Sequence, residues 1–214
     1  MTFLGPYSAR IWGRMNTGTK SVLFGAHCFF IHPWFVWLAY WRLYGWSALD
    51  PRVIVACVVH DWGYWSLEKM DDEIGETHPI LGARIMGWLF DDQKEGEVTW
   101  FHFALLHSRY YSNRLGLPFS HLCVADKAAF YLTPWWVYIP CVWLTGEWKE
   151  YLHYGRKAVA VPGSDNYEAV KKIHHGALTN DLRLWHTGLS EYLRIWVEKN
   201  KECNGIDETA VRRQ

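Results

Sequence analysis

Paired cysteines are missing from this chain. Its five cysteines are odd in number, lie far apart and never form a C-x-x-C pair. The pattern excludes a disulfide framework and offers no thiolate zinc site. Residues 1–23 also lack the continuous apolar segment of a secretory signal. We therefore expect reduced thiols and a cytoplasmic protein.

Net charge is missing as well. Lys and Arg total 22, and Asp and Glu also total 22. No global field attracts nucleic acid, so we expect no nucleic-acid partner. Four basic residues precede the first acidic residue, Asp50, and they either contact a phosphate or form an ordinary solvated surface: Arg10, Arg14, Lys20 and Arg42.

Long uninterrupted hydrophobic runs are also absent. Residues 24–41 and 129–146 carry no Asp, Glu, Lys or Arg, but prolines interrupt both stretches. They reach only the lower limit of a membrane-spanning helix, and proline is unfavourable inside one exposed to lipid. The pattern favours buried core helices and an aromatic-rich connection. A peripheral membrane contact through some of the 15 tryptophans stays open as an alternative.

The alternating pattern and Asn-Gly hairpins of a β protein are not found, and the chain reads mostly as helix. Proline near the start and glycine at the end predict a helix over residues 33–44, and Asp50 followed by Pro51 predicts the start of another. The segment 51–61 suits a buried strand equally well by its valines. Further helices are expected over residues 78–90, 95–111, 121–132, 165–176 and 189–200.

Composition divides the chain after Gly146, where charge rises and the expected helices become amphipathic. We expect an N-terminal segment (1–19), a helical core (20–146), a C-terminal helical extension (147–200) and a polar tail (201–214). The extension is too short to be assigned as a second domain.

The run "ACVVHDWGYW" (56–65) ends in two adjacent polar groups, His60 and Asp61. Burying such groups is costly unless they are compensated. A divalent metal would compensate them, because imidazole nitrogen and carboxylate oxygen are both good ligands. Taken alone, the doublet fits an ordinary hydrogen-bonded pair at a helix end better than a metal site.

Other groups of ligand type occur once in each neighbouring helical segment. Such regular spacing is hard to obtain from unrelated core residues, and these groups are His32, His78, His107 and Asp126.

The order H…HD…H…H…D resembles the HD-domain superfamily of metal-dependent phosphohydrolases, an all-helical fold. The resemblance covers roughly residues 20–132, through "HPWFVWLAYWRLYG", "VVHDWGYW", "HPILGARIM" and "CVADKAAF". It implies an all-α HD-domain helical bundle, with a short C-terminal extension, and a helix rather than a strand at 51–61.

The resemblance also implies a ligand set. His32, His60, Asp61 and Asp126 would hold a first metal, and Asp61 would bridge to a second metal held with His78 and His107. The implied cofactor is one or two divalent ions, among Mn, Fe, Co, Ni, Zn or Mg, which would grip a phosphate and generate a hydroxide for attack.

This chain departs from the family pattern after the doublet, where Tyr64 replaces a common lysine. Arg109 or Lys127 would supply the missing phosphate contact, unless they are surface or structural residues. His27 is an alternative to His32 as first ligand. Tryptophans beside the motifs would either stack against a nucleobase or belong to the core: Trp34, Trp37, Trp62 and Trp65.

The resulting expectation is a phosphohydrolase of a small phosphorylated substrate, foremost a nucleotide, by attack of a metal-bound hydroxide. Asp61, Arg109 and Lys127 are its candidate catalytic residues. Two alternatives remain: a di-iron oxygenase with the same ligand pattern, or a non-catalytic metal-stabilised module. The family often forms homo-oligomers, so self-association is an open possibility.

Overall fold

The computed structural model describes residues 15–70, 73–91, 98–202 and 206, and this part of the chain is helical without a β-strand. The expected all-α fold is confirmed. Its α-helices are α2 (Thr17–Phe24), α3 (His32–Tyr44), α4 (Pro51–Val59), α5 (Pro79–Phe90), α6 (Trp100–Leu105), α7 (Arg109–Leu115), α8 (His121–Leu132), α9 (Trp135–Thr145), α10 (Trp148–Gly155), α11 (Tyr167–Thr179) and α12 (Leu182–Asn200). Short 3-10 helices occur at Gly45–Leu49 (η1), Trp62–Tyr64 (η2) and Gly75–Thr77 (η3).

Local sequence signals account for several helix ends. Pro33 lies in the first turn of α3, and Gly45 ends the helix with a φ of 61°, a conformation that favours glycine. The Asp50 side chain accepts a hydrogen bond from the Arg52 backbone N–H, at 2.9 Å, and so caps α4. Residues 51–59 are therefore helical, and the choice between strand and helix is settled.

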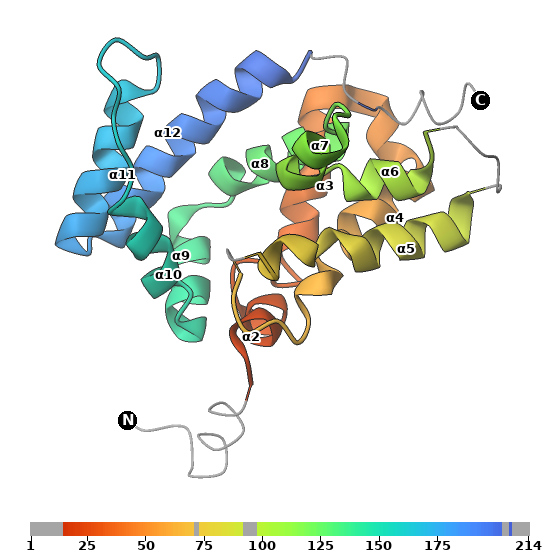
Figure 1. The fold of residues 1–214 in the computed structure, drawn as a ribbon, viewed down its shortest axis with the longest axis horizontal. Coiled ribbons are helices and arrows are strands. Elements are labelled where there is room, and N and C mark those ends of the chain that lie inside the picture. The colour runs from red at the N-terminus through yellow and green to blue at the C-terminus, as the bar shows by residue number, and fades with distance from the viewer. Residues whose placement is uncertain (1–14, 71–72, 92–97, 203–205, 207–214) are drawn as a thin grey trace.

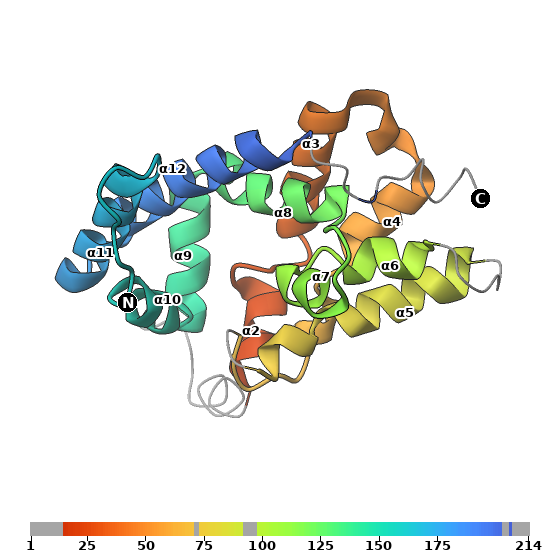
Figure 2. The ribbon, with the colours of Figure 1, turned by 45° about the horizontal axis from the view of Figure 1, so that its top comes forward.

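The largest core lies among α3, α4, α5, α6 and α8. Val36 and Tyr40 of α3, Met86 of α5, Phe103 of α6 and Leu122 of α8 are fully buried there. A second cluster joins α9, α10, α11 and α12 around Val142, Leu152 and Trp185. In Figures 1 and 2, α4, α5 and α6 lie at one end and α10 and α11 at the other, with α8 and α12 reaching between them.

The helix expected over residues 95–111 is wrong as a single helix, and residues 95–97 lie outside the described part. α6 ends at Leu105, and α7 begins at Arg109 after a turn. Ser108 explains the break, because its hydroxyl accepts a hydrogen bond from the Tyr110 N–H, at 3.2 Å, and starts a new helix. α2, α10 and the first two turns of α12 were not expected from the sequence.

The two uncharged stretches are both interrupted. A turn separates α2 from α3 within residues 24–41, and Thr133 and Pro134 separate α8 from α9 within 129–146. None of the described helices combines the length and apolarity needed to cross a membrane.

Both chain ends extend past the described residues. Residues 1–14 of the expected N-terminal segment, with Arg10 and Arg14, lie outside them, and so does most of the polar tail. Ile206 of that tail is buried, and its N–H donates to the Phe119 carbonyl at 3.2 Å. The tail therefore contributes an apolar residue to the core beside α8.

Candidate metal centre

The six predicted ligands come from five different places along the fold and meet at one end of a cavity. Most lie at helix ends, where a side chain can turn inward without interrupting the helix. They are His32 at the start of α3, His60 and Asp61 after α4, His78 before α5, His107 after α6 and Asp126 within α8.

A first group contains His32, His60, Asp61 and Asp126, whose donor atoms all lie within 4.8 Å of one another. His32 Nε2 is 3.2 Å from Asp61 Oδ2 and 3.1 Å from Asp126 Oδ1. His60 Nε2 is 3.0 Å from the same Asp61 oxygen and 3.8 Å from Asp126 Oδ1. Two imidazoles and two carboxylates thus face one point.

A second group contains Asp61, His78 and His107, again within 4.8 Å. The two Nε2 atoms are 3.2 Å apart. Asp61 Oδ1 lies 3.7 Å from His78 Nε2 and 3.5 Å from His107 Nε2. Asp61 therefore belongs to both groups and turns one carboxylate oxygen to each.

Backbone carbonyls orient three of the four histidines. The Nδ1 atoms of His60, His78 and His107 lie 2.9, 2.8 and 2.6 Å from the carbonyl oxygens of Cys57, Gly75 and Ala104. Each carbonyl is three residues earlier in the chain and can only accept, so Nδ1 must carry a proton. In the neutral ring, Nε2 then holds the lone pair, and it faces the group.

The centre is buried and its charges depend on one another. His60 and His107 are 1% exposed and Asp61 is 7% exposed. Burial opposes the charge of His60, but Asp61 and Asp126 outweigh it and raise its pKa to about 10. Burial acts against the Asp61 carboxylate too, but His60 above all holds its pKa well below the ordinary value. Without a metal, a proton on His60 thus offsets the carboxylates.

Among the buried side-chain N and O atoms without a hydrogen bond in the described part of the chain, three belong to the first group: His32 Nε2, His60 Nε2 and Asp61 Oδ2. Buried polar groups without partners are costly. All three point into the first group, where a cation would satisfy them together. These histidines and aspartates could hold a metal ion.

The structure places His32, not His27, in the first group. His27 Nδ1 instead lies 2.9 Å from the Ser21 hydroxyl, and neither group contains His27. The His27 ring borders the cavity beside Tyr64, with ring centroids 4.6 Å apart. Between the two histidines that the sequence left open, His32 has the ligand position.

A buried glutamate supports this end of the site and was not identified from the sequence. Glu147 is 1% exposed and lies between α9 and α10. Its carboxylate accepts hydrogen bonds from the Ser21 hydroxyl, the Ala26 N–H, the Thr145 hydroxyl and the Tyr151 hydroxyl. It thereby anchors the segment that leads into His32. Nothing in the local sequence distinguishes Glu147 from a surface glutamate.

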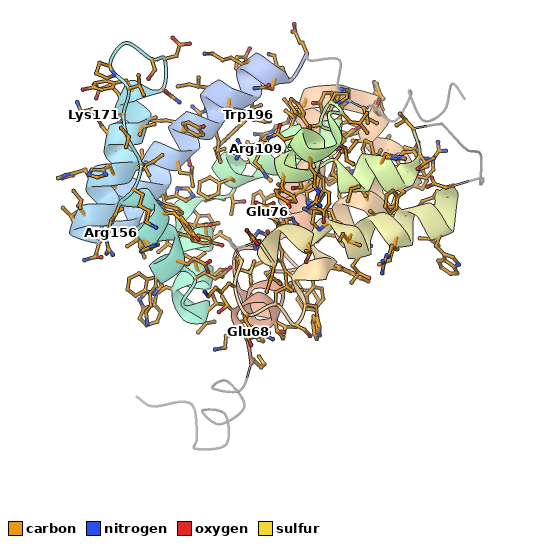
Figure 3. The ribbon with its side chains drawn as sticks, in the orientation of Figure 1. Glu68, Glu76, Arg109, Arg156, Lys171 and Trp196 are labelled. Atoms are coloured by element: carbon orange, nitrogen blue, oxygen red, sulfur yellow. The ribbon has the colours of Figure 1, made fainter. Side chains whose placement is uncertain are left out.

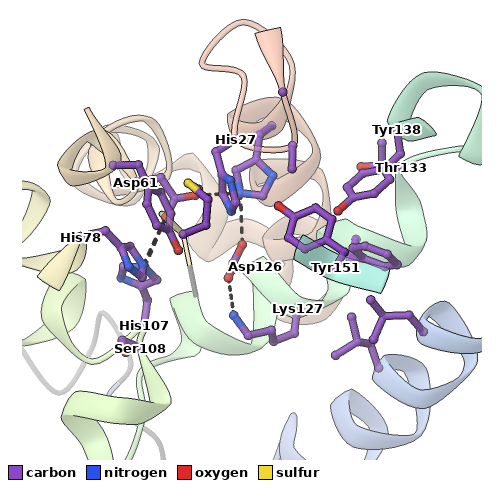
Figure 4. Close-up of a pocket in the computed structure, with 18 of the residues that line it drawn as sticks. His27, Asp61, His78, His107, Ser108, Asp126, Lys127, Thr133, Tyr138 and Tyr151 are labelled. Atoms are coloured by element: carbon purple, nitrogen blue, oxygen red, sulfur yellow. Dashed lines mark hydrogen bonds and ion pairs between the residues drawn. The ribbon is translucent and has the colours of Figure 1, made fainter. Parts of the chain in front are cut away.

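The ligand groups open into a cavity of about 640 Å³. Arg109 and Lys127 both line it, as do Glu76 and Asn113. Lys127 Nζ donates to Asp126 Oδ2 at 2.7 Å, and Figure 4 shows this pair between the histidines and the far wall. Burial works against the Lys127 charge, but Asp126 outweighs it and raises the lysine pKa. The cavity thus carries cations beside the donor groups.

Arg109 is held against an aromatic ring. Its guanidinium carbon lies 5.6 Å from the centroid of the Trp196 ring of α12. Figure 3 shows the two residues side by side above Glu76, whereas Arg156 and Lys171 lie at the α10 and α11 end. Arg109 is an exposed residue, and it lines the cavity beside this ring.

Neither of the two interpretations of the tryptophans beside the motifs, a nucleobase wall or the core, fits three of the four. Trp34, Trp62 and Trp65 are 68%, 39% and 52% exposed, and none of them lines the cavity. Trp37 packs against the core and donates its ring N–H to the Ala48 carbonyl. Tyr64 lines the cavity instead, stacked on His78 with ring centroids 4.0 Å apart.

Comparisons of the chain with models of protein families, with curated proteins and with solved structures find no match. Function is therefore inferred from the residues of the site.

Proposed function

We propose that this protein is a metal-dependent phosphohydrolase that acts on a small phosphorylated substrate. The observation that carries the proposal is the position of Asp61, which turns one oxygen to each of two ligand groups. A carboxylate shared in this way suits a pair of divalent cations, the arrangement used by many phosphatases and nucleases. The resemblance of the ordered ligand pattern to HD-domain phosphohydrolases supports the same proposal.

The donor set restricts the metal. His32, His60, Asp61 and Asp126 would hold one cation, and Asp61, His78 and His107 a second. Imidazole together with carboxylate suits Mn, Fe, Co, Ni or Zn, whereas Mg favours oxygen ligands and retains its waters. When bound, such cations supply Lewis acidity and lower the pKa of water, so that it attacks near neutral pH.

The chain itself supplies the phosphate contacts. Lys127 Nζ and the Arg109 guanidinium lie at the same cavity as the ligand groups, and both are permanent cations at neutral pH. They would bind the phosphate oxygens and offset the charge that develops during transfer. In the reaction, a water oxygen bonds to phosphorus and the ester P–O bond breaks. The products are phosphate and an alcohol that gains a proton.

The test is phosphate release by the full-length protein, stripped of metal and reloaded with Mn, Fe, Co, Ni, Zn or Mg. The panel contains nucleotides and simple phosphate monoesters. Asp61→Ala should abolish turnover and metal binding. Asp165→Ala is the matched control, because Asp165 is an exposed carboxylate paired with Lys199 on the far side of the fold.

Hydrolysis that is lost in Asp61→Ala and retained in Asp165→Ala supports the proposal. Absence of hydrolysis with every metal and every substrate refutes it. Oxygen uptake by the iron-loaded protein would then identify the oxygenase alternative, and absence of that as well would leave the metal-stabilised module.

A further inference from the structure

The cavity has two chemically different ends. All of its charged residues precede residue 128 and surround the ligand groups. The opposite wall comes from α8, α9, α10 and α12 and contains no charged side chain among the described lining residues. We define this wall as the apolar pouch, formed mainly by Phe130, Val137, Tyr138, Trp185, Leu189 and Leu193.

Two hydroxyl groups of the pouch are already engaged in hydrogen bonds. The Thr133 hydroxyl donates to the Ala129 carbonyl at 2.8 Å, and the Tyr151 hydroxyl donates to Glu147 Oε1 at 3.1 Å. A polar ligand placed against these two groups would lose its water without gaining their hydroxyl protons in return, which is costly. An apolar ligand would lose only unfavourable hydration.

Helix α8 connects the two ends of the cavity. Asp126 of the first group, Lys127 and Phe130 all line the cavity from this one helix. Residues three positions apart lie on the same face of a helix, so the Lys127 ammonium and the Phe130 ring are neighbours along the wall. Figure 4 shows Lys127 between the histidine side and the side of Tyr138 and Tyr151. A ligand bound by Lys127 therefore reaches both ends.

We propose that the substrate is an organic phosphate monoester with an apolar tail, such as an alkyl or isoprenoid phosphate. Its phosphate would lie at the ligand groups beside Lys127, and its tail in the apolar pouch. This inference rests on the proposed phosphohydrolase function and narrows its substrate class. A nucleotide fits less well, because its ribose and base would lie against a mainly apolar wall on which the Thr133 and Tyr151 hydroxyl protons are already committed. A cavity of about 640 Å³ also matches a ligand of this general size.

The first experiment measures kcat/KM for ethyl, butyl, hexyl, octyl and decyl phosphate, with adenosine monophosphate for comparison. Each added methylene that enters the pouch should raise kcat/KM about three- to fourfold, until the pouch is full. Longer alkyl phosphates should exceed the nucleotide. Hydrolysis that is independent of tail length, or that favours the nucleotide, overturns this inference and leaves the phosphohydrolase proposal intact.

A pair of variants on α9 locates the tail. Cys141 lines the pouch, whereas Leu144 of the same helix is 49% exposed and does not line the cavity. Cys141→Phe should fill the pouch and remove the preference for octyl over ethyl phosphate, while ethyl phosphate is still hydrolysed. Leu144→Phe adds a ring to the outer face and should keep the wild-type preference. Equal effects of the two variants would refute the pouch as the tail site.

A binding experiment separates failure of this inference from failure of the proposed activity. Calorimetry with methyl- and decylphosphonate, which have no ester bond to hydrolyse, measures tail binding without turnover. Decylphosphonate should bind more tightly and with a negative heat-capacity change, the marker of apolar burial. If it does so in a protein that hydrolyses no ester, the pouch assignment stands and the phosphohydrolase proposal fails. Equal affinity for the two phosphonates refutes the pouch assignment.

Discussion

Replacing Asp61 by Asn is the sharpest single perturbation of the candidate metal centre. Asn keeps the size of the side chain but removes its charge and replaces one carboxylate oxygen by an NH₂ group. Both Asp61 oxygens are in use, Oδ2 toward His32 and His60 and Oδ1 toward His78 and His107. Both groups lose an anionic oxygen, because the amide oxygen is neutral, and whichever way the amide turns, one group gains a donor that faces imidazole nitrogens.

The size of the effect follows from linkage. A metal present at a thousand times its Kd stabilises the native state by about 4 kcal/mol. A protein of this length gains about 2–4 °C in Tm per kcal/mol, so wild type should gain about 8–16 °C. Removing one partner from a buried charged group costs about 3–5 kcal/mol. If this cost is taken from the free energy of metal binding, the metal should raise the Tm of Asp61→Asn by less than about 5 °C at the same metal concentration.

The assay is thermal unfolding with and without each divalent metal, followed by circular dichroism. Asp165→Asn serves as control, because Asp165 is exposed and its substitution should leave the wild-type shift unchanged. A wild-type shift that persists in Asp61→Asn would show that the cation binds elsewhere. Absence of a shift in wild type with all six metals would refute the metal centre itself.

Three further predictions concern the surroundings of the centre. A Cβ at Gly82 would lie 2.9 Å from His60 Cα. Gly82→Ala should therefore lower the free energy of unfolding, measured in urea, by about 1–3 kcal/mol and weaken metal binding. Unchanged values for both would contradict this packing. After dialysis, His32→Ala should have lost its bound metal and His27→Ala should have retained it. Equal loss of metal from the two variants would contradict the assignment of the first group. Burial lowers the pKa of His186 from 6.5 to about 4. The unfolded state therefore binds more protons, and stability falls as pH decreases from 6.5 to about 4, by up to about 3 kcal/mol. His186→Phe should flatten this part of the stability profile measured by urea unfolding, relative to wild type, and an unaltered profile would refute the burial argument.

The ligand positions could be predicted because each has a local signal. His60 and Asp61 end an apolar helix, and Pro79 follows His78 at the start of another. Polar groups at the ends of apolar helices are costly to bury unless they are compensated. Their positions are visible in the sequence itself. The break at Ser108 also had a local signal, an N-cap residue inside an apparently continuous helical pattern. It was missed because apolar periodicity alone does not show where one helix ends and the next begins.

The far half of the cavity could not be predicted in this way. Val137 and Trp185 are ordinary apolar residues in the sequence, and only the packing of α8, α9 and α12 brings them to one wall. The same holds for Glu147, whose role depends on partners more than a hundred residues away in the chain. Long-range contacts of this kind leave no periodic pattern in the sequence, because the pattern around each residue reflects only the helix that contains it.

The hydrogen bonds of Glu147 join the two halves of the cavity. Its carboxylate holds Ser21 and Ala26 in front of α3 and accepts from Tyr151, which lines the apolar pouch. A Cβ on Gly25 would lie 2.0 Å from Glu147 Oε2, so only glycine allows this approach. These hydrogen bonds therefore connect the pouch wall to the segment that ends at His32. Because His32 is a member of the first ligand group, the helices after Gly146 help to determine the geometry of a centre whose ligands all precede them.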